Sequence, residues 1–450
     1  MSIVILFSFA LSCTIGIVSP ALTFNLLLMF FPLQQVIWSS SEFFRGSVAG
    51  MRTANYIVGL VTVICATISL AQDQGRVQGT RSTGQVCTWV LYAWVTASLA
   101  WSPGAELGLD AMSTVWPYWL LFLFIAPLFV RNIDDLRKTL RWGLVLSAAM
   151  CLAILVSPEF TQQWGRLGLT VGGMARSTRT SPLALGELGG LCLILSILAI
   201  SFRAGYIWNI GCLIAAGCAV TVAVLSGSRG QLLCAVVAVM AGFPLSRPAR
   251  NWGSYIFGLV ALSIILAAVL YVTTLVAGSG SAHMAKRWGA ESSQSDAMLR
   301  FDNAIYLINL YATSPGHWIQ GLGFYSFGAT NPYGEPYTHV ISVDMLCEQG
   351  LVGAVLFIAI IVATVRSLRV LYKLVGSEPQ ARWAIGNLAA LIIYQFVLVN
   401  KQGNLAGSFA FFLLMIIPCR LAKRAELGIS VVFEYKDEPI DQSGLQHSPV

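Results

Sequence analysis

Long runs of apolar residues dominate the chain, and short polar segments separate them. Each run approaches the roughly 20 apolar residues with which an α-helix crosses a bilayer. The pattern predicts about 12 to 13 crossings, of which the first two can also form a shallow hairpin. The predicted crossings are residues 3–19, 21–38, 54–71, 86–100, 115–130, 142–156, 183–202, 206–225, 230–243, 254–277, 340–365, 384–399 and 405–419.

The apolar runs are continuous, whereas a membrane barrel needs strands of alternating polarity. Backbone groups surrounded by lipid must then be satisfied inside helices. The sequence therefore predicts an all-α, polytopic membrane helical bundle. The first apolar run lacks both a basic segment before it and a small-residue cleavage site after it, so we expect a retained crossing and not a signal peptide.

Composition supports the same class of protein. Of the 450 residues, 10% are charged and 56% are hydrophobic, and the mean hydropathy is +0.73. A soluble domain carries about 25% charged residues. Most of the ten cysteines lie inside apolar runs, where they act as small hydrophobes. No CxxC pair occurs, which argues against a disulfide scaffold and a zinc site.

The formal charge of +7 is not the footprint of a nucleic-acid-binding protein, because the basic residues fall in short loops between crossings. Basic loops of this kind face the cytoplasm. This rule predicts that residues 157–182, 226–229 and 278–339 face the opposite side, and it leaves the orientation of residues before 54 open. The basic segments are 131–141, 247–250, 366–382 and 420–424.

The sequence divides into one membrane domain with a single large loop. The expected parts are N-terminal transmembrane helices (1–277), a large loop on the side opposite the cytoplasm (278–339), C-terminal transmembrane helices (340–419) and a disordered cytoplasmic tail (420–450). A loop of about 60 residues in a compact protein is usually functional. Within it, Asp296 as N-cap and the apolar positions that follow predict a helix over 296–313, which Ser314-Pro-Gly ends.

Arg229 lies in the turn Ser226-Gly-Ser-Arg-Gly230, between two apolar runs. The turn is expected to hold the guanidinium near the outer membrane surface, where two parallel hydrogen bonds can clamp a phosphate. The alternative is an interfacial arginine with its stem in the membrane and its head in water. Ions at such depths are functional candidates.

Arg300 and His339 are the other candidates. Arg300 lies on the predicted loop helix next to Asp302, so it is either functional or part of a local ion pair. His339 immediately precedes a long apolar run, at the point where a helix reaches the outer face. An imidazole there can accept or donate a proton near neutral pH, although an ordinary interfacial role is the alternative.

Three carboxylates fall inside predicted crossings. Asp344 and Glu348 are four residues apart, on one helix face, and Glu187 lies in Leu183-Ala-Leu-Gly-Glu-Leu188. Carboxylates at that depth need a polar cavity or cationic partners. They are expected to line a cavity, to pair with an arginine or to form a structural network.

Several motifs are absent. The chain has no Asp-x-Asp, HxxH, Walker loop or GxSxG elbow. Their absence argues against soluble nucleotide-sugar chemistry, a membrane zinc protease and an ATPase.

Three motifs together resemble the O-antigen ligase / O-antigen polymerase superfamily of bacterial envelope enzymes. Ser226-Gly-Ser-Arg-Gly-Gln-Leu232 resembles the Ser-x-Ser-Arg-Gly turn of that family, and Arg300 to Gly323 resembles the start of its large periplasmic loop. His339 to Gly353 resembles its His-Asn…Leu-x-Glu-x-Gly stretch, except that Val340 replaces the asparagine. The similarity covers about residues 86–419 and is concentrated within about 183–365.

The resemblance implies transfer of a glycan from a polyprenyl-pyrophosphate carrier to the hydroxyl of a glycan or lipid acceptor, outside the bacterial inner membrane and without metal or ATP. It implies that Arg229 and Arg300 bind the pyrophosphate and that His339 is the general base or orients the acceptor. Asp344, Glu348 and Glu187 would then line or support the cavity. Membrane lipids are the other expected partners.

Two further classes stay open. A flippase or another polysaccharide transporter is one alternative, although the chain shows no internal repeat and its candidate charges gather at one face. A non-catalytic envelope assembly subunit is the other, and it would not need two arginines and a histidine. The residues do not separate a ligase from a polymerase.

Overall fold

The computed structural model describes residues 2–46, 48–163, 166–171, 178–179, 181–200, 205–247, 256, 263, 267, 290–332, 334–376 and 378–431. Nearly all of the crossing expected at 254–277 lies outside these described residues. The same holds for the first part of the large loop, 278–289, and for residues 432–450 of the expected tail.

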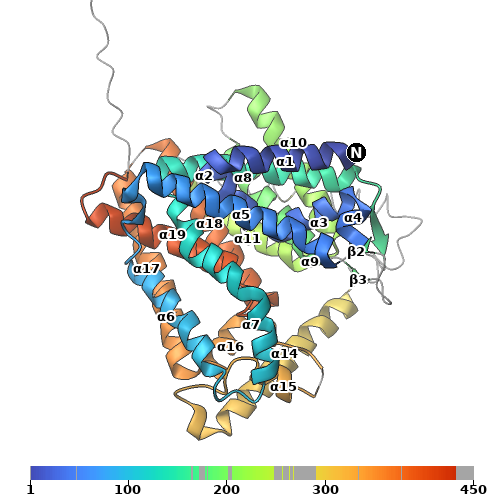
Figure 1. Ribbon diagram of the computed structural model, residues 1–450, viewed down its shortest axis with the longest axis vertical. Coiled ribbons are helices and arrows are strands. Elements are labelled where there is room, and N and C mark those ends of the chain that lie inside the picture. The colour runs from blue at the N-terminus through green and yellow to red at the C-terminus, as the bar shows by residue number, and fades with distance from the viewer. Residues whose placement is uncertain are drawn as a thin grey trace, which may run out of the picture.

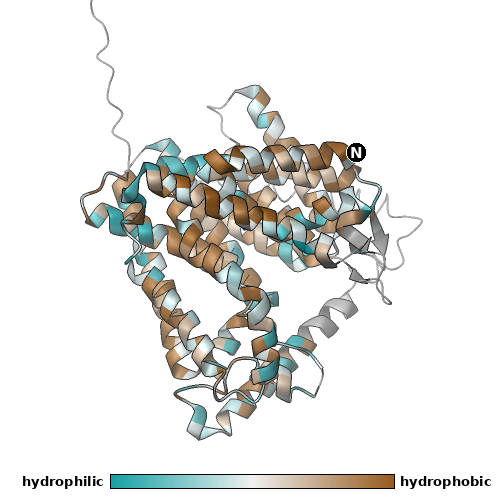
Figure 2. Cartoon of the chain, viewed as in Figure 1, coloured by the Kyte–Doolittle hydropathy of each residue, from teal (hydrophilic) through white to brown (hydrophobic). Residues whose placement is uncertain are grey.

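The protein is a helical bundle, with 81% of the described residues in helices. Figure 1 shows the arrangement of the helices, and Figure 2 shows apolar residues along the bundle with polar residues toward helix ends and loops. The elements are α1 (Ser2–Val18), α2 (Pro20–Leu28), α3 (Phe30–Ser40), α4 (Glu42–Gly46), α5 (Val48–Gln72), η1 (Gln74–Val77), α6 (Thr83–Ser98), α7 (Ala105–Trp119), η2 (Leu120–Ile125), η3 (Ala126–Phe129), α8 (Ile133–Val156), β1 (Phe160–Gln163), β2 (Arg166–Val171), β3 (Thr178–Arg179), α9 (Pro182–Ala199), α10 (Tyr206–Leu225), α11 (Arg229–Ser246), α14 (Ala290–Ala312), η5 (Pro315–His317), α15 (Ser326–Thr330), α16 (Ile341–Cys347), α17 (Gly350–Val375), α18 (Pro379–Gln402) and α19 (Phe409–Glu426).

Eight helices within the described residues are long and apolar enough to cross a membrane, as expected for a multi-pass membrane protein. The bent pair α2–α3 adds a ninth if it counts as one span. The eight are Arg52–Gln72, Ala105–Phe129, Ile133–Val156, Pro182–Ala199, Tyr206–Leu225, Arg229–Ser246, Gly350–Val375 and Pro379–Gln402.

The second predicted crossing is broken at its middle. Helices α2 and α3 meet at an angle of 83°. Pro32 explains the position of the break, because a proline ring clashes with the carbonyl of the residue four positions earlier, and α2 ends at that residue, Leu28. The expected continuous helix at 21–38 is therefore two short helices.

A small antiparallel sheet departs from the all-α expectation. Its strand order is β1-β2-β3, with Phe160 opposite Leu169 and Thr170 opposite Arg179. It lies in segment 157–182, which the sequence places outside the membrane. Phe160, Leu167 and Leu169 are buried, so the sheet is packed against the bundle by its apolar positions.

Helices α9, α11 and α18 form the centre of the bundle. In α9 and α18, 78% and 72% of the residues of an apolar 18-residue stretch are buried, a larger share than in the other candidate spans. A β-carbon on Gly190 would lie 2.2 Å from the Tyr394 hydroxyl, so the close approach of α9 and α18 needs a glycine there. The Tyr394 hydroxyl donates to the Glu187 carbonyl over 3.3 Å.

The basic segments gather at one end of this bundle. Arg137 at the start of α8 donates to the Gln380 side chain at the start of α18. Arg420 on α19 donates to the Arg76 and Val130 carbonyls. These contacts bring together three of the four segments that the positive-inside rule places on the cytoplasmic side.

The crossing expected at 340–365 is interrupted. Its first part is the short helix α16, and the candidate span α17 begins at Gly350. Gly350 has φ +66°, and a β-carbon there would lie 2.4 Å from the Ile319 carbonyl oxygen, so the loop before α15 packs into the break. The tail expected at 420–450 begins later than predicted. Helix α19 extends to Glu426, so residues 420–426 are helical and not part of a tail.

Candidate functional site

The centre of the candidate site is the C-terminal end of α18. Helices α11 and α18 run antiparallel, because Gly386 packs against Ser246 at one end and Gly230 packs against Lys401 at the other. Arg229 is the first residue of α11 and therefore lies beside the last turn of α18. This end is opposite to the end that holds the basic segments.

The turn that carries Arg229 is fixed by short-range contacts. Gly227 has φ +69° and ends α10, and the Ser226 hydroxyl donates to the Ala223 carbonyl over 2.7 Å. Next to Arg229, the Gln231 side chain donates to the Leu183 carbonyl over 2.7 Å and ties the turn to the start of α9. The turn thus places a half-buried guanidinium at a defined position.

His339 reaches the same end of α18 from the large loop. The backbone of Gln402 lies near its imidazole, and the Tyr337 ring contacts it edge to face with 4.5 Å between ring centroids. Three residues further on, the Ser342 hydroxyl and backbone N–H donate to the Asn400 side-chain oxygen over 2.5 and 3.3 Å. Residues 400–402 of α18 therefore join the histidine to the turn of Arg229.

The backbone of His339 is strained. Its φ is +69°, and within the described residues only Tyr325 is a second non-glycine residue with positive φ. The left-handed region is unfavourable for a side chain with a β-carbon, and such residues cluster at functional sites.

The surroundings of His339 favour the neutral imidazole. Burial and then the positive charge of Arg300 lower the pKa of His339, whereas Glu335 and the Gln402 backbone oppose the shift. The Glu335 carboxylate stands 3.8 Å from Nε2, and Nδ1 is buried without a hydrogen bond of good geometry among the described residues. A neutral imidazole of this kind can accept a proton near pH 7.

Arg300 is half-buried on α14 and close enough to influence His339. The expected helix at 296–313 is confirmed, although α14 begins at Ala290. The Tyr306 hydroxyl on α14 donates to the Thr330 carbonyl over 2.6 Å and holds the helix against α15. Of the sequence-predicted groups, Arg229, Arg300 and His339 thus lie around one end of the bundle.

Asp344 and Glu348 are placed differently from the expectation. They lie on α16 and at its C-terminal end, before the candidate span, and in the described structure neither pairs with an arginine. Asp344 accepts a hydrogen bond from the Thr338 hydroxyl over 2.5 Å, next to His339. Glu348 accepts from the Phe327 and Tyr325 N–H groups over 3.0 and 3.3 Å.

These two carboxyls support the loop around the histidine. Both side chains are buried, and burial raises the pKa of Asp344 and of Glu348. Their mutual repulsion further raises the pKa of Glu348. The expected roles of this pair were to line a cavity, to pair with an arginine or to form a structural network. The contacts are those of a structural network.

A cavity of about 500 Å³ adjoins the end of α18. Its walls are mostly apolar, from Leu27, Phe31, Leu398 and Phe409, whereas Gln35, Glu187, Gln395 and Asn404 add polar groups. The Glu187 carboxylate accepts from the Gln395 side chain over 2.6 Å. Tyr337 and Gln402 line the cavity and also contact His339, so the cavity and the histidine share two residues.

The sequence did not single out Lys401, Gln402, Gln395 or Tyr337. The signal for the first two is the polar segment Lys401-Gln-Gly-Asn404, which interrupts the apolar runs 384–399 and 405–419. Lys401 matters most, because its ammonium group lies against Gly230 and adds a cation next to Arg229.

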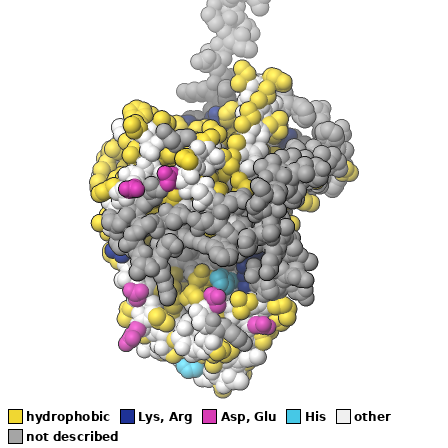
Figure 3. Space-filling view, turned by 90° about the vertical axis from the view of Figure 1, so that its right-hand side faces the viewer, with side chains coloured by type: hydrophobic (Ala, Val, Ile, Leu, Met, Phe, Trp, Pro, Cys, Tyr) yellow, Lys and Arg dark blue, Asp and Glu magenta, His cyan; other side chains and the backbone are white. Residues whose placement is uncertain are grey.

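Figure 3 shows the molecule turned by 90° from the view of Figure 1. On this face a histidine side chain lies next to a basic and an acidic side chain. Across the described ranges, no three His, Cys, Asp or Glu side chains come together as metal ligands. The arrangement offers cations, a half-buried imidazole and an adjacent cavity that is apolar along most of its wall. Such a site can hold an anionic lipid-linked group and activate a hydroxyl.

The chain was compared with protein-family models and with curated proteins, and neither comparison found a match.

Proposed function

We propose that the protein transfers a glycan from a polyprenyl-pyrophosphate carrier to an acceptor hydroxyl at the outer face of the bacterial inner membrane. The observation that carries this proposal is the end of α18, where Arg229, Lys401 and His339 gather beside the cavity. Arg300 acts on the same histidine. The resemblance of the three sequence motifs to the O-antigen ligase / O-antigen polymerase superfamily supports the same chemistry.

In the proposed reaction, the acceptor oxygen forms a bond to the anomeric carbon as the bond from that carbon to the pyrophosphate oxygen breaks. His339 takes the proton of the acceptor hydroxyl, and the pyrophosphate leaves with the electron pair. Negative charge increases on the leaving group, and Arg229, Arg300 and Lys401 stabilise it as preorganised cations. A positioned base contributes roughly 10²- to 10⁴-fold to the rate.

The cavity fits the two ends of such a donor. Leu27, Phe31 and Phe409 form an apolar wall for a polyprenyl chain, and Gln35, Gln395 and Asn404 provide hydrogen-bonding groups for sugar hydroxyls. The proposed periplasmic loop contributes His339 and Arg300, so part of the site would lie outside the hydrocarbon layer.

The test is a transfer assay with purified protein in liposomes, polyprenyl-pyrophosphate glycan and candidate acceptors. Arg229→Ala and His339→Ala should each reduce transfer by at least 100-fold, since each removes a group that acts on the transition state. His317→Ala is the matched control, because His317 lies in the same loop on η5, outside the cavity and away from α18.

Wild-type transfer in either of the two site variants would contradict the proposed mechanism. Product length separates the two versions of the function, because a polymerase makes long products and a ligase adds one glycan to its acceptor. A transporter would move the lipid-linked glycan across the liposome membrane without consuming it, and that result would replace the proposal.

A further inference from the structure

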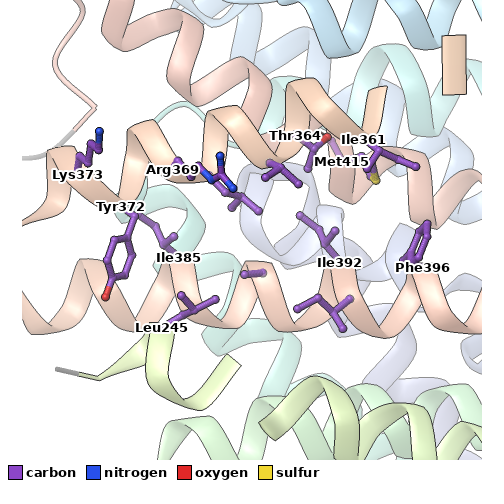
Figure 4. A pocket seen from close by; sticks show the side chains of 14 residues that line it. Leu245, Ile361, Thr364, Arg369, Tyr372, Lys373, Ile385, Ile392, Phe396 and Met415 are labelled. Atoms are coloured by element: carbon purple, nitrogen blue, oxygen red, sulfur yellow. Dashed lines mark hydrogen bonds between the residues drawn. The ribbon is translucent and has the colours of Figure 1, made fainter. Parts of the chain in front are cut away.

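A second cavity lies between α17 and α18. It has a volume of about 480 Å³. Figure 4 shows Ile361 and Thr364 of α17 opposite Ile392 and Phe396 of α18, with Lys373 and Tyr372 toward one end of the groove. The remaining lining residues are Leu245, Val365, Leu368, Arg369, Ile385, Ala389, Ile393 and Met415.

The walls of this groove suit a hydrocarbon chain. Most of the lining side chains are aliphatic or aromatic. Thr364 is the polar exception in the middle, and its hydroxyl donates to the Ile360 and Met415 carbonyls over 2.9 and 3.2 Å. Its hydrogen-bonding capacity is therefore used inside the protein, and no donor is left for a polar ligand at this depth.

Two cations mark one end of the groove. Arg369 and Lys373 are four residues apart on α17, so they lie on one face of the helix, and both are exposed. In the part of the chain that the structure describes, neither forms an ion pair or a hydrogen bond, whereas the neighbouring Arg382 stacks on the Tyr372 ring at 5.0 Å. Their charge is available to an external anion.

The length of the groove matches one leaflet of a bilayer. Lys373 and Ile361 are separated by about 18 Å along the axis of α17, at a rise of 1.5 Å per residue. Half of a hydrocarbon core is about 15 Å. The cations stand within about 9 Å of the end of α17 at Val375, so in a bilayer that α17 crosses they would lie near the lipid headgroups.

We propose that this groove binds an anionic phospholipid of the leaflet that faces the basic segments. One acyl chain would lie between α17 and α18, and the phosphate would lie between Arg369 and Lys373. Charge complementarity selects the anionic lipid, because a zwitterionic headgroup brings its own cation and gains less from two more. The proposal does not depend on glycan transfer, and its test does not measure transfer.

The experiment is native mass spectrometry of the full-length protein purified in detergent and mixed with equal amounts of phosphatidylglycerol and phosphatidylcholine. Phosphatidylglycerol should be retained preferentially. Each basic residue near a lipid headgroup changes binding by roughly fivefold. Arg369→Gln should therefore lower phosphatidylglycerol retention about fivefold, and the double variant with Lys373→Gln about 25-fold.

Arg366→Gln is the matched charge control, since Arg366 is an exposed arginine one turn earlier on α17 that does not line the groove. Val365→Trp tests the acyl chain, because Val365 lines the groove and an indole there would fill it. Val362→Trp is its control, with a comparably exposed valine outside the groove.

Loss of retention in Arg369→Gln and Val365→Trp, with retention unchanged in both controls, is the expected result. Equal retention of the two lipids by the wild type, or equal loss in Arg366→Gln and Arg369→Gln, would overturn the proposal. Preferential displacement of phosphatidylglycerol by a polyprenyl phosphate would also overturn it, because the groove would then be a second carrier site.

Discussion

The side-chain amine of Lys401 lies against the α-carbon of Gly230, and a β-carbon at position 230 would stand 2.0 Å from both Cε and Nζ. This relationship joins α11 to α18 and places a lysine next to Arg229. The sequence does not predict this contact, because the glycine and the lysine are far apart along the chain.

Gly230→Ala is expected to move Lys401 without unfolding the bundle, because the conflict is with the far end of a flexible side chain. Transfer should fall about tenfold, since a misplaced cation stabilises the leaving group less. The liposome transfer assay measures this. Gly211→Ala on α10 is the control, because a β-carbon there meets nothing within 4 Å, and it should leave transfer unchanged. Equal activity in the two alanine variants would exclude Lys401 from the site.

The pH dependence of transfer should follow His339. Its lowered pKa keeps the imidazole neutral near pH 7, and transfer should fall as more acidic pH protonates it. Glu335 raises this pKa, so Glu335→Gln should move the acid limb of the rate profile to lower pH.

The measurement is the initial rate of transfer between pH 5 and pH 8. Those pH limits span about one and a half units on either side of the ordinary histidine pKa. Glu106→Gln, at an exposed acidic residue on α7, is the control and should leave the limb in place. A limb that moves to higher pH in Glu335→Gln would show that another group controls the rate.

Stability should decrease with rising pH because of the buried carboxyls. Burial raises the folded-state pKa of Glu348 and Asp344, so the folded protein binds more protons than the unfolded chain above the ordinary carboxyl value. This contribution is complete at about pH 4 and is lost as pH rises through the raised pKa values. A loss on the order of 2 kcal/mol between about pH 5 and pH 9 is expected.

Thermal unfolding in detergent measures this decline. Glu348→Gln should reduce it by about half or more, because glutamine does not ionise and keeps an oxygen for one of the two N–H groups, that of Phe327 or that of Tyr325. Glu426→Gln, at a largely exposed residue, should leave the decline unchanged. A wild-type midpoint that rises over the same interval would contradict the assignment.

Arg420 should be among the most important residues for stability. It is fully buried on α19 and donates to the carbonyls of Arg76 in η1 and of Val130, the residue after η3. Arg420→Ala leaves these carbonyls without a partner and creates a cavity, so a loss of roughly 2–4 kcal/mol is expected. Arg366→Ala, at an exposed arginine, should change the unfolding midpoint little. Equal effects of the two substitutions would refute the role of Arg420.

The contrast between these two arginines illustrates the limit of sequence analysis. The positive-inside rule treats Arg420 and Arg366 alike, as two charges in basic segments. Only the packing of α19 against residues 76 and 130 buries one of them. Likewise, the run at 340–365 contains Asp344 and Glu348, but these residues did not predict a break at Gly350, because Gly350 and the loop that packs against it are close only in the folded chain.

The sequence by itself determined the helical, multi-pass class of the protein, because apolar runs of sufficient length are a local property of the chain. It also placed Arg229 and His339 at helix ends, since each adjoins an apolar run. The tertiary structure alone decided that Lys401 and Gln402 join them, that Asp344 and Glu348 hold the loop, and that a small sheet forms in segment 157–182. These outcomes depend on contacts between residues distant in sequence, and no local pattern encodes such contacts.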